Sequence, residues 1–235
     1  MGCRDPNWEW QVTGSLQQEF VPALGWPALT PAYDAVVRLL TREERWRGAF
    51  LRQIAPVAGD NILDVGCGTG SLAILMKQAA PGARIVGLDP DADVLARAAT
   101  KAAKAGVEIE WRQGFAGDAA ALGERFDKAV SSLVFHQVPL AGKVSGVASM
   151  VDAVRPGGEV HIADFARQRS RTMRALFGLV GRLDGVENTR PNADGAIERI
   201  LGDISTEAAE PTQRVATPLG EISLFLLRRS APHRE

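Results

Sequence analysis

A glycine-rich segment joins a short apolar run to a stretch of helical periodicity, and it reads Asp64-Val65-Gly66-Cys67-Gly68-Thr69-Gly70. Glycine permits positive φ angles and lets a ligand approach the backbone closely. Asp89 follows nineteen residues beyond Gly70, at the end of the next apolar run. A carboxylate in that place can accept hydrogen bonds from both hydroxyls of a ribose. Together these features predict a site for a nucleoside-like, ribose-bearing cofactor.

Each feature also has a purely structural interpretation. The glycines could serve only to make a tight turn, and Asp89 could cap a helix that begins near Asp91. Both interpretations would have to hold at once, so we favour the cofactor site.

A dinucleotide is the main alternative ligand, because residues 68–73 (GTGSLA) fit the degenerate pattern G-x-G-x-x-A. The charge of Asp64, directly before the loop, argues against it. A pyrophosphate would be repelled by a nearby carboxylate, whereas a cationic sulfonium with an ammonium group would be attracted. The charge therefore favours a sulfonium cofactor.

Strand-like and helical segments alternate on both sides of this loop. Such alternation predicts an α/β fold with a parallel sheet, and two β-prone runs around Pro218-Leu219-Gly220 predict a terminal hairpin. From residue 31 to 56 the spacing favours two helices, interrupted near Thr41. The expected strands are 61–65, 83–89, 107–113, 126–135 and 159–165, the expected helices are 71–80, 91–106 and 143–154, a mostly helical insertion covers about 170–206, and the hairpin covers 213–229.

Composition bounds the class of protein. A chain of 235 residues suits one α/β domain, here expected over 31–235 behind a Trp- and Pro-rich arm or lid at 1–30. Lys plus Arg number 27 against 28 for Asp plus Glu, so no charge excess attracts nucleic acid. No run of about 18 apolar residues occurs and no secretory signal begins the chain, so we expect no stable membrane insertion and a cytoplasmic location. Two cysteines, Cys3 and Cys67, support neither a disulfide framework nor a metal site.

Four segments, ILDVGCGTG, VGLDPDADVLARA, FDKAVSSLVFHQV and RPGGEVHIADF, together resemble the class I S-adenosylmethionine-dependent methyltransferases. The resemblance runs from about Tyr33 to the final strand. Within the superfamily, the sequence is similar to the small-molecule branch that includes the ubiquinone and menaquinone methyltransferases. It implies a Rossmann-like three-layer sandwich whose seven-stranded sheet is mostly parallel with an antiparallel last strand. It also implies S-adenosyl-L-methionine as cofactor and S-adenosyl-L-homocysteine as product. The acceptor would be a small organic molecule, aromatic or quinol-like, methylated on O, N or C.

The resemblance implies a set of cofactor contacts at matching positions. Tyr33 either closes over the methionine end of the cofactor or only packs there, and Arg42 and Arg47 either bind its carboxylate or pair with Glu43 and Glu44. The other implied contacts are Asp64, Gly66, Cys67, Gly68 and Gly70 in the loop, Asp89 and Pro90 after the second strand, Gly114, Phe115 and Ala116 after the third, and Ser131 and Leu133 at the end of the fourth.

One position departs from the family. An acid usually follows the third strand and bonds the adenine amino group, whereas Phe115 stands in that register here. Asp118 lies in its own Gly-Asp-Ala triplet, but its use would shorten the connection to the fourth strand by three residues. We therefore expect Phe115 to contact the adenine, with help from the backbone of Ala116.

Acceptor binding and catalysis have fewer candidates. His136 follows the fourth strand and either accepts a proton from the acceptor or orients a helix or the substrate. Asp164, Asn188 and Arg190 are further acceptor contacts, although residues 187–192 could equally be an ordinary surface loop. His161 alternates with Ala163 inside a strand and is expected to be packed and neutral. Two alternative functions stay open: an NAD-dependent oxidoreductase and a non-catalytic cofactor-binding protein. A homodimer stays open as the oligomeric state.

Overall fold

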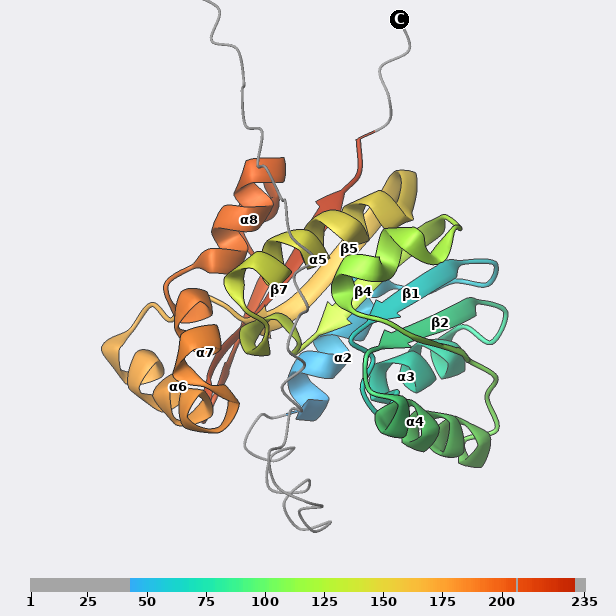
Figure 1. Ribbon diagram of the computed structural model, residues 1–235, viewed down its shortest axis with the longest axis horizontal. Coiled ribbons are helices and arrows are strands. Elements are labelled where there is room, and N and C mark those ends of the chain that lie inside the picture. Colours follow the sequence, from blue (N-terminus) through green and yellow to red (C-terminus); the bar gives the residue numbers. More distant parts are fainter. Residues whose placement is uncertain (1–42, 206, 231–235) are drawn as a thin grey trace, which may run out of the picture.

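The computed structural model describes residues 43–205 and 207–230. Its centre is a seven-stranded sheet in the order β3-β2-β1-β4-β5-β7-β6 (Figure 1). Strands β1 to β5 are parallel, whereas β7 runs antiparallel to both of its neighbours. The strands are β1 (Asn61–Val65), β2 (Arg84–Asp89), β3 (Glu110–Gln113), β4 (Phe126–Ser132), β5 (Val154–Phe165), β6 (Gln213–Thr217) and β7 (Gly220–Arg228).

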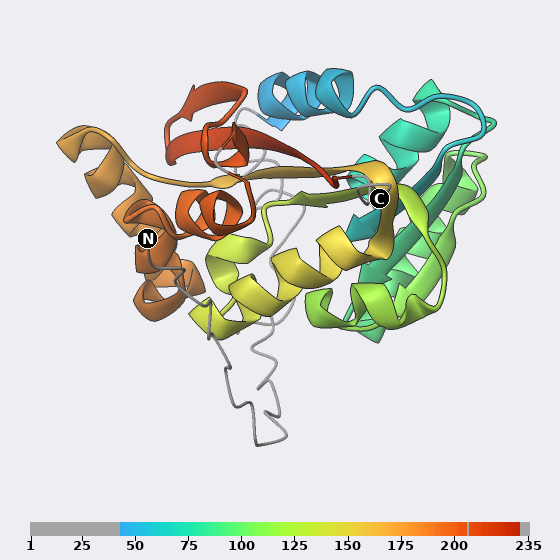
Figure 2. The same ribbon diagram turned by 90° about the horizontal axis from the view of Figure 1, so that it is seen from above.

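Helices cover both faces of the sheet, with α2 and α5 on opposite sides (Figure 2). One apolar core joins the sheet to α2, α3 and α6, and the other joins it to η1, α5 and α8. The three-layer fold predicted from the family resemblance is thereby confirmed. The helices are α2 (Glu43–Ile54), α3 (Ser71–Ala79), α4 (Ala92–Lys104), α5 (Leu140–Ala153), α6 (Arg171–Asp184), α7 (Val186–Ala193) and α8 (Ala196–Ile204), with 3-10 helices η1 (Ala116–Leu122), η2 (Phe135–Gln137) and η3 (Glu207–Ala209).

Several predicted boundaries are corrected. Strand β3 begins only at Glu110, and β4 ends at Ser132 because Leu133 turns away with a φ of 56°. Strand β5 begins at Val154 and includes the Arg-Pro-Gly-Gly segment that was expected to lie between helix and strand. The predicted helical content of 170–206 is confirmed by α6, α7 and α8. The arm at 1–30, the helix expected before Thr41, Tyr33 and Arg42 all lie outside the described residues.

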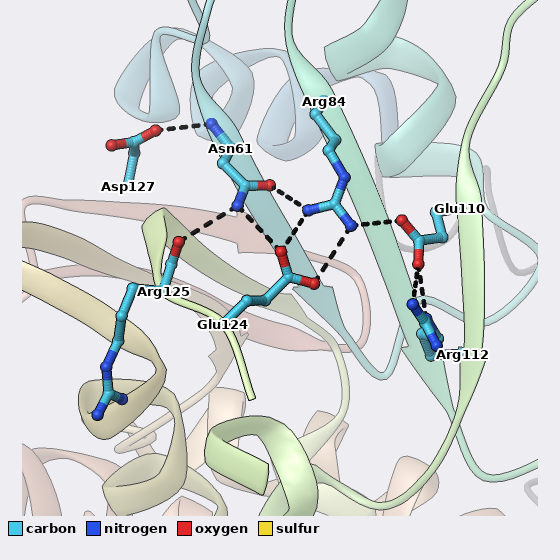
Figure 3. A network of polar contacts seen from close by, with 7 residues as sticks. All are labelled: Asn61, Arg84, Glu110, Arg112, Glu124, Arg125 and Asp127. Carbon is cyan, nitrogen blue, oxygen red and sulfur yellow. Dashed lines mark hydrogen bonds and ion pairs between the residues drawn. The ribbon is translucent and has the colours of Figure 1, made fainter. Parts of the chain in front are cut away.

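A polar network holds the amino ends of the first three strands at the sheet edge away from the glycine loop (Figure 3). Arg84 on β2 donates to Asn61 Oδ1 at 2.9 Å and to Glu124 Oε2 at 2.6 Å, and it also pairs with Glu110 on β3. The backbone amide of Asn61 donates to Asp127 Oδ2 at 2.7 Å. Because these side chains are partly exposed, each ion pair contributes at most about 1 kcal/mol. Their role is to align strand ends.

Among the described residues, no helix is both long and apolar enough to cross a membrane.

Candidate functional site

The glycine loop leaves β1 in a conformation that side chains would resist. Gly66, Gly68 and Gly70 have φ angles of 68°, 53° and 73°. A Cβ at Gly66 would come within 2.4 Å of the Val134 side chain, whereas a Cβ at Gly68 would meet no atom of the described residues within 4 Å. Gly66 must therefore be glycine for packing, and Gly68 faces open space. That space is the place where a ligand can approach the backbone.

Asp89 at the end of β2 turns toward this loop. Its Oδ2 accepts a hydrogen bond from the Gly68 amide at 2.9 Å, and its Oδ1 accepts one from the Asp91 amide at 3.1 Å. The helix α4 is capped by Asp91 instead, whose Oδ1 accepts from the amides of Asp93 and Val94 at 2.9 and 3.1 Å. The interpretation of Asp89 as the helix cap is therefore wrong. Burial raises the pKa of the Asp89 carboxyl, and the two amides oppose that shift.

Asp64 and Ser131 are buried polar side chains at the same edge of the sheet. They come from adjacent parallel strands, since Asp64 pairs with Val130 in the β1–β4 register. Each is 1% exposed, and within residues 43–205 and 207–230 no hydrogen-bond partner is found for either carboxylate oxygen of Asp64 or for the Ser131 hydroxyl. An unsatisfied buried polar group costs about 1 to 3 kcal/mol. Such groups at a strand terminus indicate a ligand site.

The electrostatics of Asp64 suit a cation. Burial raises the pKa of its carboxyl to about 7, the Arg47 guanidinium opposes the shift, and the Asp89 carboxylate adds to it. A positive ligand nearby would favour the ionised form. Arg47 also forms an ion pair with Glu43 one turn away on α2. Pairing with a glutamate of this helix was one of the two roles predicted for Arg47. Cys67 is buried, and burial raises the pKa of its thiol, so it is no nucleophile.

The segment after β3 lies beside Asp89, since the Gly114 amide donates to the Asp89 carbonyl at 3.1 Å. The adjacent Gln113 side chain donates to the Pro90 carbonyl at 3.0 Å. Asp118, which the loop length seemed to exclude, curls back through η1 and accepts from the Phe115 amide at 2.8 Å. This bond caps the start of η1, because a side chain three residues after the N-cap can reach the N-cap amide. The choice of Phe115 as the adenine contact stays a prediction.

Leu133 and the following turn redirect the chain after β4. The left-handed conformation of Leu133 is rare for a side-chain-bearing residue and indicates local strain. The Leu133 amide donates to the Ala163 carbonyl of β5 at 2.8 Å, and the Val134 amide donates to Asp164 Oδ2 at 3.1 Å. The strained turn thus places η2 and its histidine at the carboxyl ends of β4 and β5.

His136 and Asp164 form a buried pair there. The ring Nδ1 of His136 lies 2.7 Å from Asp164 Oδ1, and the Gln137 side-chain nitrogen lies 3.2 Å from Nε2. Asp164 has no exposed surface, and its oxygens also accept from the amides of Val134, His136 and Phe165. Contact between Asp164 and an acceptor stays a prediction, and both carboxylate oxygens are already engaged by His136 and by backbone amides. Its contacts fit the task of holding His136.

The polar segment 187–192 is not a loop, because it forms most of helix α7. Arg190 points outward, with a side chain 79% exposed and an ion pair to Asp194 at 3.7 Å, so it does not join the other candidates. Asn188 is half-buried and offers its carbonyl to Lys143 at 2.9 Å. Asn192 is fully buried and donates to the Phe165 carbonyl at 2.7 Å.

Lys143 on α5 and His161 on β5 are two further buried polar side chains. Lys143 on α5 is completely buried and donates a hydrogen bond to the carbonyl of Phe135, directly before His136. The one signal in the sequence for a buried lysine here is its position in a largely apolar helix. His161 is buried between Gln53 and Glu159 at 3.3 and 3.2 Å, and burial lowers the pKa of its imidazole. This surrounding fits the packed neutral histidine that was predicted.

Comparison with known proteins identifies the family. A family model described as a methyltransferase domain matches residues 62–158. The chain is 34% identical over 176 residues to a ubiquinone biosynthesis O-methyltransferase from a Methylobacterium species, with 69% of this chain and 66% of that protein covered. It is 31% identical over 160 residues to a demethylmenaquinone methyltransferase from Thermus thermophilus, with 66% of this chain and 69% of that protein covered. The chain thus spans about two thirds of the length of each relative.

The fold is also that of solved methyltransferases. Magnesium protoporphyrin IX methyltransferase from Synechocystis PCC 6803, solved with bound S-adenosylhomocysteine, superposes with a TM-score of 0.63 at 20% identity over 88% of this chain and 90% of that chain. By its sequence relatives, the chain belongs to the class I S-adenosylmethionine-dependent methyltransferases. Within that class it is similar to methyltransferases whose names place them in quinone biosynthesis. The predicted family, transferase class and cofactor are confirmed, and the family decides against the dinucleotide alternative.

Proposed function

We propose that this methyltransferase transfers a methyl group from S-adenosylmethionine to a small aromatic or quinol-like acceptor, with the cofactor held by the glycine loop and the acceptor near His136. The observation that carries the proposal is that the loop and the His136–Asp164 pair emerge at the same edge of one parallel sheet. The two relatives named above act in ubiquinone and menaquinone biosynthesis by their names, which supports a quinol-like acceptor.

The cofactor side would use residues that the fold leaves ready for a ligand. Asp89 would accept from the ribose hydroxyls, and the unpartnered Asp64 and Ser131 would face the methionine part. Gly68, with no neighbour above it, would let the cofactor lie against the backbone. Cys67, Gly66 and Gly70 shape this loop, and the segment Pro90, Gly114, Phe115 and Ala116 would flank the adenine, with Leu133 at the methionine end.

When bound, S-adenosylmethionine supplies a methyl group on a positively charged sulfur. The chain's own contribution is to hold the acceptor nucleophile in line with that methyl group and to exclude water. With Nδ1 donating to Asp164, Nε2 of His136 carries the lone pair. It would take the proton of an acceptor hydroxyl or amine as the nucleophile attacks, once the acceptor displaces the contact of Nε2 with Gln137.

Isothermal titration with S-adenosylhomocysteine, and with NAD as a control, tests the cofactor half. Binding of the first alone is expected, and binding of neither would overturn the proposal. Catechol, hydroquinone and aniline then serve as probe acceptors, with release of S-adenosylhomocysteine followed by mass spectrometry. A methylated phenolic oxygen or ring carbon would separate the O- and C-transfer chemistries. A protein that binds the cofactor but methylates no acceptor would favour the non-catalytic alternative.

The proposal includes a cytoplasmic location, which cell fractionation tests. It also includes a homodimer, for which light scattering on a sizing column gives the mass directly.

A further inference from the structure

Lys143 is an unusual residue for the place it occupies. It lies on α5 with no exposed surface, although its neighbours on that helix are mainly small or apolar. A buried ammonium group is costly unless it is hydrogen bonded. Its Nζ donates to two backbone carbonyls, that of Phe135 in η2 and that of Asn188 in α7, the latter at 2.9 Å. One side chain on α5 therefore connects two separate segments.

Both connected segments border the pair that we assign to the acceptor side. Phe135 directly precedes His136, so the bond to its carbonyl fixes the peptide from which the histidine side chain projects. Asn188 belongs to the helix whose Asn192 side chain also donates to the Phe165 carbonyl at 2.7 Å, next to Asp164. Helix α7 is thus fastened at two points, to the turn after β4 and to the end of β5.

We propose that Lys143 is a positioning residue that clamps α7 onto the turn carrying His136 and thereby sets the shape of the acceptor side of the site. This inference rests on the proposed function, because it assumes that the acceptor binds near His136. Lys143 does not touch the reacting atoms. Its effect passes through the two carbonyls that it holds.

The competing explanation is that the long aliphatic side chain of Lys143 only fills space between α5 and its neighbours. Lys143→Met separates the two, since methionine keeps much of the length and apolar bulk but has no donor. Lys128→Met is a matched control: Lys128 also donates to a carbonyl, that of Ala55 at 3.1 Å, and to Asp60 at 2.7 Å, at the opposite edge of the sheet.

Hydrogen exchange followed by mass spectrometry on peptides of the full chain gives the readout. In Lys143→Met we expect the amides of α7 and η2 to exchange faster by on the order of 10-fold to 100-fold, while α3 and α4 keep their protection. In Lys128→Met, α7 should be as protected as in the wild type. Unchanged protection of α7 in Lys143→Met, or an equal loss over the whole domain, would overturn the clamp.

A second measurement needs only the wild type and covers the case in which the variant fails to fold. Burial lowers the pKa of Lys143 to about 8, opposed by the Asp164 carboxylate of β5; His136 on η2 is the other titratable side chain of this group. If opening of α7 exposes the ammonium to water, the open state has the ordinary, higher lysine pKa and binds more protons between these values. Raising the pH from 7 to 9 therefore favours the closed state, by about tenfold.

The expected result is a rise in α7 protection from pH 7 to pH 9 relative to α3, after correction for the intrinsic exchange rate. A constant ratio would contradict the clamp. Titration with S-adenosylhomocysteine keeps this outcome separate from the proposed function: Lys143→Met should bind it as the wild type does. If the wild type itself does not bind it, the proposed function fails, whatever α7 does.

Discussion

The carboxylate of Asp89 accepts a hydrogen bond from the backbone amide of Gly68 at 2.9 Å. The residue predicted to bind the ribose therefore also holds the loop predicted to receive the cofactor. One acidic side chain thus links β2 to the turn after β1 and helps to fix the conformation of the loop. Preorganisation of this kind reduces the entropy that binding would otherwise cost.

Replacement of Asp89 by alanine should weaken binding of S-adenosylhomocysteine. The variant loses both the acceptor for the ribose hydroxyls and the bond to Gly68, and each charged hydrogen bond contributes about 1.5 to 3 kcal/mol. Isothermal titration measures the change. Glu124→Gln, which alters a carboxylate in the network at the far edge of the sheet, should bind normally. An Asp89→Ala protein with the wild-type affinity would exclude the ribose assignment.

Asp64 should make the stability of the apoprotein depend on pH. The folded state keeps a proton on this carboxyl up to about pH 7, whereas the unfolded chain releases it near pH 4. A raised carboxyl pKa means that rising pH favours unfolding through this range, and the full penalty is present above pH 7. Asp64→Asn removes it. The stability of that variant relative to the wild type should grow by on the order of 1 to 4 kcal/mol between pH 4 and pH 8.

Urea unfolding at the two pH values tests this prediction. Ser131→Ala is the control, because it removes the neighbouring unpartnered hydroxyl without removing a titrating group. Its effect should be the same at both values. A relative stability of Asp64→Asn that does not change with pH would show that the carboxyl is not held in its protonated form. The same variant should bind S-adenosylmethionine more weakly, because the negative charge opposite the sulfonium is lost.

Substitution of Gly68 by alanine should separate folding from binding. The added methyl group meets no atom within 4 Å in the part of the chain that the structure describes, so the folded state loses only about 1 kcal/mol through the positive φ. It would project into the space assigned to the cofactor, however, and S-adenosylhomocysteine should bind much more weakly. Thermal unfolding and titration of the same sample give both quantities. Normal affinity would place the cofactor elsewhere.

His136→Gln should lower turnover and leave cofactor affinity nearly intact. Loss of a general base typically reduces the rate by 10²- to 10⁴-fold, whereas the glycine loop and Asp89, which carry most of the predicted cofactor contacts, lie at the ends of β1 and β2. His161→Gln is the matched control, since His161 is equally buried in β5 but packs against α2 through Phe50. The rates are compared with the best acceptor from the probe set. Equal turnover in both variants would leave His136 with a packing role only.

Local signals in the sequence were enough to predict that the residues of the candidate cofactor site lie together. The glycines, Asp64 and Asp89 lie at the ends of two consecutive strands, and the rule that parallel strands end at one edge brings them together. The seven-stranded, mostly parallel sheet with its antiparallel last strand came from the family resemblance and was confirmed. The predicted ends of the strands were less accurate. The turn at Leu133, for example, depends on a positive φ angle that a leucine in the sequence does not predict.

The acceptor half depends on contacts between segments far apart in the chain. Lys143 reaches Asn188, 45 residues away, and no periodicity reveals such a pairing. Arg190 was predicted to contact the acceptor, but the segment is helical, and its buried residues include Thr189 and Asn192 instead. Asp118 accepts from the Phe115 amide across the compact turn of η1, a contact that counting residues along the chain did not predict.

The division of the sheet edge also follows the order of the chain. Every described residue assigned to the cofactor lies between Asp64 and Leu133. The residues that surround His136 lie after Leu133, up to Asn192. The crossing point is the strained turn at Leu133 and Val134, where Val134 packs on Gly66. In a chimera joined there, this chain would keep its cofactor-binding half and would take its acceptor specificity from a relative. Such a chimera needs the valine and the glycine to be transferred as a pair.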